Sequence, residues 1–280
     1  MTTTTAVQAF SPARTIRLGF SRVGYEIRSY FRQTDGVFFT FLFPLMMLFI
    51  FSVAFSNTNF GLYADGTKVT AAAFYLPAML AAGILLSGLQ NMATDIAAEK
   101  SDGTLKRLGG SPLPVMSYFM GKIGQVFVTG VLQAAIIILA ARVIFQVPLP
   151  TDVGHWLTFA WVFVLGVTTC AVLGIALSAV PRSGRSAIAV IIPITLVLQF
   201  ISGVYIGFSN LPSWLQNFAS VFPLKWLAQG MRYVFLPTSF KAVEVGNSWN
   251  LGGILIATLI WLVVGLVLCR VTFRWIRKDS

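Results

Sequence analysis

Charged residues are scarce in this chain, and acidic residues are the scarcest of them. Only 10% of the 280 residues are charged and 56% are hydrophobic, whereas a soluble domain carries about 25% charged residues. The mean hydropathy of +0.80 is too high for a surface in contact with water. These values exclude most soluble enzyme folds and predict a membrane protein, with room for about six spans of roughly 20 residues each.

Residues that could carry out chemistry are also few. The single histidine, His155, is expected on a short outer loop as a surface residue. Cys170 and Cys269 both lie in apolar runs, which argues against a disulfide framework and against a zinc site. No Asp or Glu lies deep within an apolar run, which weighs against proton coupling. No nucleophile has a base beside it, so an intramembrane enzyme is not indicated.

A nucleotide-binding loop is missing as well. The pattern G-x-x-x-x-G-K-[ST] does not occur, because the only Gly-Lys pair, Gly121-Lys122, has Met116 in place of the first glycine and is followed by Ile123. We therefore expect no ATP site and no cofactor in this chain. If the protein moves a substrate, a partner must supply the energy.

Six apolar runs are each long enough to cross about 30 Å of hydrocarbon as a helix. They are Val37 to Ser56, Ala71 to Ala93, Tyr118 to Phe145, Trp156 to Val180, Ser186 to Phe208 and Leu251 to Cys269. The predicted fold class is an all-α polytopic membrane protein with six transmembrane helices. Lys122 and Arg142, near the two ends of the third run, are expected to snorkel to the interface.

The distribution of positive charge predicts the orientation. With the N-terminus inside, fifteen of the twenty Lys and Arg residues fall in inner segments and five in outer segments. The positive-inside rule then places both termini in the cytoplasm. This rule also accounts for the net charge of +11 without a nucleic-acid partner.

The segment before the first run has the pattern of an amphipathic helix. Apolar residues at helical spacing share one face: Ile16, Phe20, Val23, Ile27 and Phe31. Arginines lie on the other side, together with the exceptions Leu18 and Tyr25: Arg14, Arg17, Arg22, Arg28 and Arg32. Such a helix lies in the headgroup plane. It is either an elbow that docks a cytoplasmic partner or a plain interfacial anchor. We predict a flexible N-terminus over 1–13, the elbow over 14–35 and a transmembrane domain over 36–278.

Two further patterns concern packing. The connection from Ser209 to Asn250 is apolar but interrupted by prolines, which predicts one or two short re-entrant or interfacial helices; an ordinary amphipathic loop is the alternative. Small residues recur every four positions in the fourth run and predict close helix packing within the bundle: Gly166, Cys170, Gly174 and Ser178.

The longest inner connection, Thr94 to Phe119, holds the most specific motif. A short helix is expected around Asp95 to Lys100, interrupted by Gly103. A second is expected over Thr104 to Leu108, with Thr104 as its N-cap and with glycines and prolines after it. A short helix parallel to the membrane would suit a cytoplasmic partner, and a solvated turn is the alternative.

This connection contains Glu99-Lys100-Ser101-Asp102-Gly103-Thr104-Leu105-Lys106-Arg107-Leu108, followed by Ser111-Pro112-Leu113. The motif resembles the cytoplasmic-loop motif of type-2 ABC exporter permeases, which include the daunorubicin-type antibiotic-resistance permeases. The resemblance continues in Ser202-Gly203-Val204, Leu211-Pro212-Ser213-Trp214-Leu215, Phe222-Pro223-Leu224 and Arg232. With the amphipathic start and the six spans, it covers nearly the whole chain, about Arg17 to Lys278. Gly109-Gly110 departs from the family pattern and predicts a short coupling helix.

The resemblance implies a half-transporter, in which two permease chains pair with two ATPase subunits that bind ATP and Mg²⁺. It implies drug efflux or lipid export across a bacterial inner membrane, with membrane lipids as further partners. It also implies that motion passes through the elbow and the first cytoplasmic loop. The residues expected to couple to the ATPase are Arg28, Arg32, Glu99, Thr104, Leu105, Lys106, Arg107 and Leu108. For the cations, contact with the membrane surface is the alternative.

The family places the substrate path at the centre of a dimer, lined by the first, second and fifth spans. The corresponding residues in the second and fifth spans are Leu80, Ile84, Ser87, Gln90, Gln199, Phe200, Ser202 and Tyr205. Apolar walls with a few amides and hydroxyls suit an amphipathic molecule. Each of these residues has helix packing as its alternative role. For the whole chain, the alternative function is an ATP-independent channel or scaffold.

Overall fold

The computed structural model describes residues 11–63, 66–181 and 183–272. The first ten residues of the predicted flexible N-terminus and the last residues of the predicted transmembrane domain lie outside the described residues. The described chain is helical with no β-strand, and an isolated bridge joins Leu62 and Lys68. Six of its helices are long and apolar enough to cross a membrane. The predicted all-α fold class is confirmed.

The spans begin and end within a few residues of the apolar runs, except that the second continues beyond its run to Ser101 and the fifth ends at Ile201, well before the predicted Phe208. They are α2 (Thr34–Ala54), the continuous element α3 (Ala71–Leu85), η1 (Leu86–Asn91) and α4 (Met92–Ser101), then α6 (Val115–Val143), α7 (Val153–Leu177), α8 (Gly184–Ile201) and α11 (Leu251–Thr272). Nearly every residue of α3 is buried, whereas α2 and α11 bury only a small share of their side chains, as helices facing lipid do.

The remaining helices are short or lie before the first span. The elbow is α1 (Pro12–Phe31), and its N-cap Ser11 accepts a hydrogen bond from the Arg14 N–H. The cytoplasmic loop holds α5 (Thr104–Gly109). Between the fifth and sixth spans the chain forms η2 (Phe208–Asn210), α9 (Ser213–Ala219), α10 (Pro223–Phe235), η3 (Thr238–Val243) and η4 (Val245–Asn247). The expectation of short helices in this connection is confirmed.

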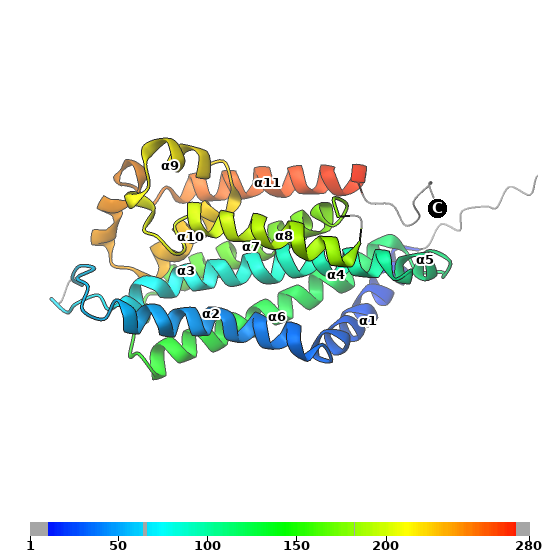
Figure 1. The fold of residues 1–280 in the computed structure, drawn as a ribbon, viewed down its shortest axis with the longest axis horizontal. Helices are drawn as coiled ribbons and strands as arrows, with labels where there is room; N and C mark the ends of the chain where they lie inside the picture. Colours follow the sequence, from blue (N-terminus) through cyan, green and yellow to red (C-terminus); the bar gives the residue numbers. More distant parts are fainter. Residues whose placement is uncertain (1–10, 64–65, 182, 273–280) are drawn as a thin grey trace, which may run out of the picture.

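The helices give the molecule two distinct ends (Figure 1). The first turns of α1, the helix α5 and the last turn of α11 gather at one end, which we call the α5 end. The segment after α2 and the helix α9 gather at the other, the α9 end. Both ends of the described chain therefore lie at the same end of the bundle.

The second span differs from its prediction in length and in geometry. No separate helix begins at Asp95; the span instead continues through η1, a π-helical segment, and α4 to Ser101. The helix extends past the apolar run because its carboxylates find partners there: Glu99 bonds to Tyr118 and Lys122 of α6. A π-helical turn within a longer helix is rare and occurs often at functional sites.

Glycines allow α7 to cross this π-helical segment at short distance. A Cβ on Gly174 would lie 2.6 Å from the Gly88 carbonyl oxygen, and one on Gly88 would lie 2.6 Å from Cys170 Cβ. Cys170 is fully buried. The small residues predicted to mediate packing in the fourth run do so, and Cys170 is a packing residue.

We expect Gly174→Ala to lower the free energy of unfolding by about 1–3 kcal/mol, because the added methyl group collides with backbone that cannot rotate away. The thermal unfolding midpoint of the purified protein in detergent measures this. Gly252→Ala on α11 is the control, since a Cβ there meets nothing within 4 Å. Equal midpoints for the two variants would contradict the close crossing.

Candidate functional site

The elbow α1 packs along α6 because two glycines on α6 leave room for it. A Cβ on Gly124 would lie 2.5 Å from Val23 Cγ2, and one on Gly121 would collide with Arg22. Ser117 Oγ, near the start of α6, donates a hydrogen bond of 2.8 Å to the Thr15 carbonyl oxygen. The two helices therefore run in the same direction, and both begin at the α5 end.

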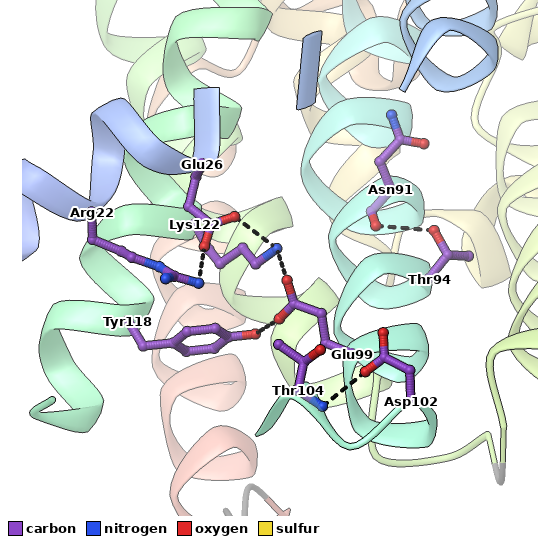
Figure 2. A network of polar contacts seen from close by, with 9 residues as sticks. All are labelled: Arg22, Glu26, Asn91, Thr94, Glu99, Asp102, Thr104, Tyr118 and Lys122. Atoms are coloured by element: carbon purple, nitrogen blue, oxygen red, sulfur yellow. Dashed lines mark hydrogen bonds and ion pairs between the residues drawn. The ribbon is translucent and has the colours of Figure 1, made fainter. Parts of the chain in front are cut away.

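A buried lysine joins three helices at this contact. Lys122 Nζ of α6 lies 2.7 Å from Glu99 Oε1 of α4 and 3.0 Å from Glu26 Oε2 of α1 (Figure 2). Lys122 and Glu26 are both only 4% exposed. The expectation that Lys122 snorkels to the interface is wrong, because α1 covers it and supplies a carboxylate there.

Arg22 and Tyr118 complete the charge cluster, which we define as Arg22, Glu26, Glu99, Tyr118 and Lys122. Arg22 Nη2 lies 2.7 Å from Glu26 Oε1. Tyr118 OH donates a hydrogen bond of 2.6 Å to Glu99 Oε2. Both Glu99 oxygens therefore have a partner, and the two cations balance the two carboxylates. Removing one partner of such a buried pair leaves an uncompensated charge.

A cavity of about 170 Å³ adjoins the charge cluster on the side of α4. Its lining includes Tyr30 and Gln33 of the elbow segment and Asp95 and Asp102 from the end of the second span and the turn after it. Burial raises the pKa of Tyr30 to about 12, so this phenol stays protonated at physiological pH. Within the described residues, no group of three or more metal-binding side chains comes together here or elsewhere.

Helix α5 begins immediately after the charge cluster. Gly103, with a φ of +81°, is its N-cap, and Asp102 Oδ1 accepts a hydrogen bond of 2.8 Å from the Thr104 N–H (Figure 2). The prediction of Thr104 as the N-cap is therefore wrong by one residue, because the left-handed turn favours glycine. Leu105 is buried and anchors the helix, whereas Lys106 and Arg107 are exposed.

The remaining predicted coupling residues occupy different positions. Leu108 is half-buried on α5. Arg28 and Arg32 are exposed on α1, on a different side from the charge-cluster residues Arg22 and Glu26. Whether any of these residues contacts an ATPase stays a prediction.

The sequence analysis did not predict four cluster members as site residues: Arg22, Glu26, Tyr118 and Lys122. Glu26 carried a signal, since it is the only acidic residue in the elbow and stands four residues after Arg22, a spacing that pairs charges on a helix. Tyr118 and Lys122 share that spacing on α6. Nothing in the sequence shows that α1 lies over them.

A groove of about 600 Å³ opens between α2, the second span and α8. Three predicted path residues line it, namely Gln90, Gln199 and Tyr205, and Asn91 and Thr195 join them. Thr195 Oγ1 donates a hydrogen bond of 2.6 Å to Gln90 Oε1, and Tyr205 OH donates one of 2.6 Å to Gln199 Oε1. All the residues that line the groove are uncharged.

The π-helical segment explains the polar side of the groove. Its last residues, Gln90 and Asn91, are adjacent in sequence and both line the groove. Gln90 bonds to α8, while Asn91 Nδ2 donates a hydrogen bond of 2.8 Å to Thr40 Oγ1 of α2. The segment therefore places two amides between the helices on either side of the groove.

The other predicted path residues do not line this groove. Leu80, Ile84, Ser87 and Ser202 are buried in helix packing. Ser87 Oγ donates a hydrogen bond of 3.0 Å to Gln133 Oε1 of α6, away from the groove. Phe200 is exposed, with its ring centroid 5.0 Å from that of Tyr205.

The described residues thus form a polytopic membrane protein, with an uncharged groove on one side of the bundle and an exposed basic helix at one end. A family model described as an ABC-2 family transporter protein matches residues 58–271. The chain therefore belongs to the ABC-2 family of transporter proteins, whose members generally work with an ATPase subunit.

Curated relatives carry transport-permease names. Ycf38 of Porphyra purpurea, named as a transport permease, is 25% identical over 231 residues, which cover 79% of this chain and 77% of the relative. YbhR of Escherichia coli, named as a multidrug ABC transporter permease, is 21% identical over 64% of this chain and 48% of its own length. YadH of the same species, named as an inner membrane transport permease, is 20% identical over 69% of this chain and 74% of its own length.

We expect Lys122→Met to lower the free energy of unfolding by about 3–5 kcal/mol, because Glu26 and Glu99 then face each other with their shared cation removed. The thermal unfolding midpoint in detergent at neutral pH is the measurement. Lys68→Met, at an exposed lysine in the segment between α2 and α3, should leave the midpoint unchanged. A midpoint for Lys122→Met that matches this control would show that the cluster is not needed for docking α1.

Proposed function

We propose that this chain is the permease subunit of an ATP-driven exporter and forms the path for hydrophobic or amphipathic compounds, either drugs and antibiotics or lipids. A separate ATPase subunit would bind ATP and Mg²⁺ and dock at the α5 end. The observation that carries the proposal is the placement of α5, a short exposed basic helix that follows directly on the span bearing the groove residues Gln90 and Asn91.

The coupling route in this proposal uses one continuous element. Leu105 anchors α5 in the bundle, and Lys106 and Arg107 remain exposed for acidic groups of the ATPase. The turn at Gly103 joins α5 to α4, where Glu99 meets the charge cluster. A displacement of α5 is therefore passed both to the second span and, through Lys122 and Glu26, to the elbow.

The groove supports a second copy of the chain as a partner. It opens on the side of α2 and α8, and these are the spans, with α11, that bury the smallest share of their side chains within one chain. Two chains meeting through these faces would turn two open grooves into one enclosed path. We propose a homodimer with two ATPase subunits, in a bacterial inner membrane with both termini cytoplasmic.

The lining of the groove supports the substrate class. Its walls combine leucine, isoleucine and phenylalanine side chains with a similar number of amide- and hydroxyl-bearing side chains. A charged substrate would find no counter-ion among these residues, and a fully apolar one would make no use of the amides and hydroxyls that line the groove. A neutral or weakly polar amphiphile satisfies both conditions.

We expect Arg107→Ala to weaken coupling to the ATPase. The permease, co-expressed with the ATPase encoded nearest to it, is purified through a tag, and ATP hydrolysis by the complex is measured in lipid with and without hydrophobic drugs. Drug-stimulated hydrolysis should fall about tenfold, since the variant removes an exposed cation from α5 without touching the cluster.

Lys241→Ala is the matched control, because Lys241 is exposed in η3, in the connection between the fifth and sixth spans. Drug-stimulated ATP hydrolysis by the complex with Lys241→Ala should equal that of the unsubstituted complex. Failure of any ATPase to co-purify with the folded permease would overturn the proposal and favour a channel or scaffold.

A second test fills the groove. We expect Leu196→Trp to reduce transport about tenfold or more by occupying the path, because Leu196 lines the groove. Val197→Trp, at the next residue of α8, is the control: Val197 is also exposed but is not among the groove-lining residues. Efflux of a fluorescent amphiphile from cells that express the complex is the measurement, and equal efflux for both variants would rule out this groove as the path.

A further inference from the structure

Helix α1 has a basic side that the charge cluster does not use. Its side toward α6 is formed by Gly19, Arg22, Glu26 and Tyr30. Arg17, Arg28 and Arg32 are exposed on another side. Arg28 and Arg32 are four residues apart, so their side chains lie next to each other on the helix. Within the described part of the chain neither of these two guanidinium groups forms an ion pair.

The two arginines lie at the end of α1 that joins the first span. Thr15 is bonded to Ser117 near the start of α6, and Val23 meets Gly124, seven residues further along it. The last turn of α1 is therefore displaced along α6, away from the α5 end, and α2 begins directly after it (Figure 1). Arg28 and Arg32 lie at the junction between α1 and the first span, whereas Lys106 and Arg107 lie at the α5 end.

An apolar groove begins beside these arginines. It has a volume of about 350 Å³ and is formed by Phe31 of α1, Phe38 and Leu45 among the residues of α2, and Leu132 and Ile136 of α6. Every lining side chain is apolar. Phe31 stacks on Phe41 at 6.3 Å between ring centroids, and it directly precedes Arg32 in the sequence. Phe31 also follows Arg28 by three residues, a spacing that makes the two side chains neighbours on the helix surface, so the groove adjoins the basic side of α1.

We propose that Arg28, Arg32 and this groove form a binding site for an anionic phospholipid, with the phosphate between the two guanidinium groups and one acyl chain in the groove. Arginine pairs bind phosphate through several charge-assisted hydrogen bonds, and basic side chains attract anionic headgroups at a membrane surface. Exposed Ile16 and Phe20 on the same helix fit an element that lies in the interface.

A phospholipid fits this surface better than the ATPase does. The ATPase must reach the α5 end, and the arginines lie along α6 away from it, next to side chains that would expose apolar surface to water. A bound lipid would bridge α1, α2 and α6 and hold the elbow at the membrane boundary. The site is a property of the permease alone and does not depend on the proposed transport function.

The test is lipid binding to the purified full-length chain in detergent, followed by native mass spectrometry during titration with dioleoyl phosphatidylglycerol or dioleoyl phosphatidylcholine. The unsubstituted chain should bind the anionic lipid more tightly. The double variant Arg28→Gln, Arg32→Gln should weaken phosphatidylglycerol binding about thirtyfold and leave phosphatidylcholine binding unchanged. Arg17→Gln, on the same side of α1 but eleven residues before Arg28, should retain the preference.

The acyl-chain half of the site has its own variant pair. Ile136→Trp fills the groove and should weaken binding of both lipids, whereas Leu139→Trp, an exposed residue of α6 outside the groove, should not. Equal affinity of the unsubstituted chain for the two lipids would overturn the proposal, as would unchanged binding in Ile136→Trp. A double arginine variant that keeps its lipid preference but no longer retains the ATPase would assign these arginines to the ATPase interface instead.

Discussion

The burial of one lysine between carboxylates from two other helices is the constraint on which this end of the molecule depends. Burial of the Lys122 ammonium group requires the carboxylates of Glu26 and Glu99 to pair with it. Their approach requires α1 to lie directly on α6, which Gly121 and Gly124 allow. The electrostatic contact and the steric one are therefore conditions for the same docking, and neither is sufficient alone.

The second span links the two regions that the proposed function needs. Its π-helical segment presents Gln90 and Asn91 to the groove, and its last turns carry Glu99 into the charge cluster. Both regions thus belong to one continuous helix, whose first part, α3, is almost entirely buried. In the proposed transport cycle, this helix would connect a movement at the α5 end to the shape of the groove.

Hydropathy predicted the spans well and predicted their polar contacts poorly. Apolar runs identified six helices because a backbone in hydrocarbon must bond to itself. The same reasoning ended the second span at Ala93, since it treats a carboxylate as a boundary, whereas the helix continues to Ser101. The same reasoning also placed the Lys122 side chain at the membrane interface. Both errors arise because a charge tolerates burial when another helix supplies its partner.

What the sequence by itself determined is the class of protein: the spans, the small-residue packing of α7, the short helix predicted over Thr104 to Leu108 and the resemblance that the family match bears out. These follow from local composition and from motifs read in one stretch of chain. Only the tertiary structure decided which side of α1 meets α6, that Glu26 reaches Lys122, and that Gln90, Gln199 and Tyr205 share a groove while Leu80 and Ser87 do not. Those outcomes depend on how helices distant in sequence pack against one another.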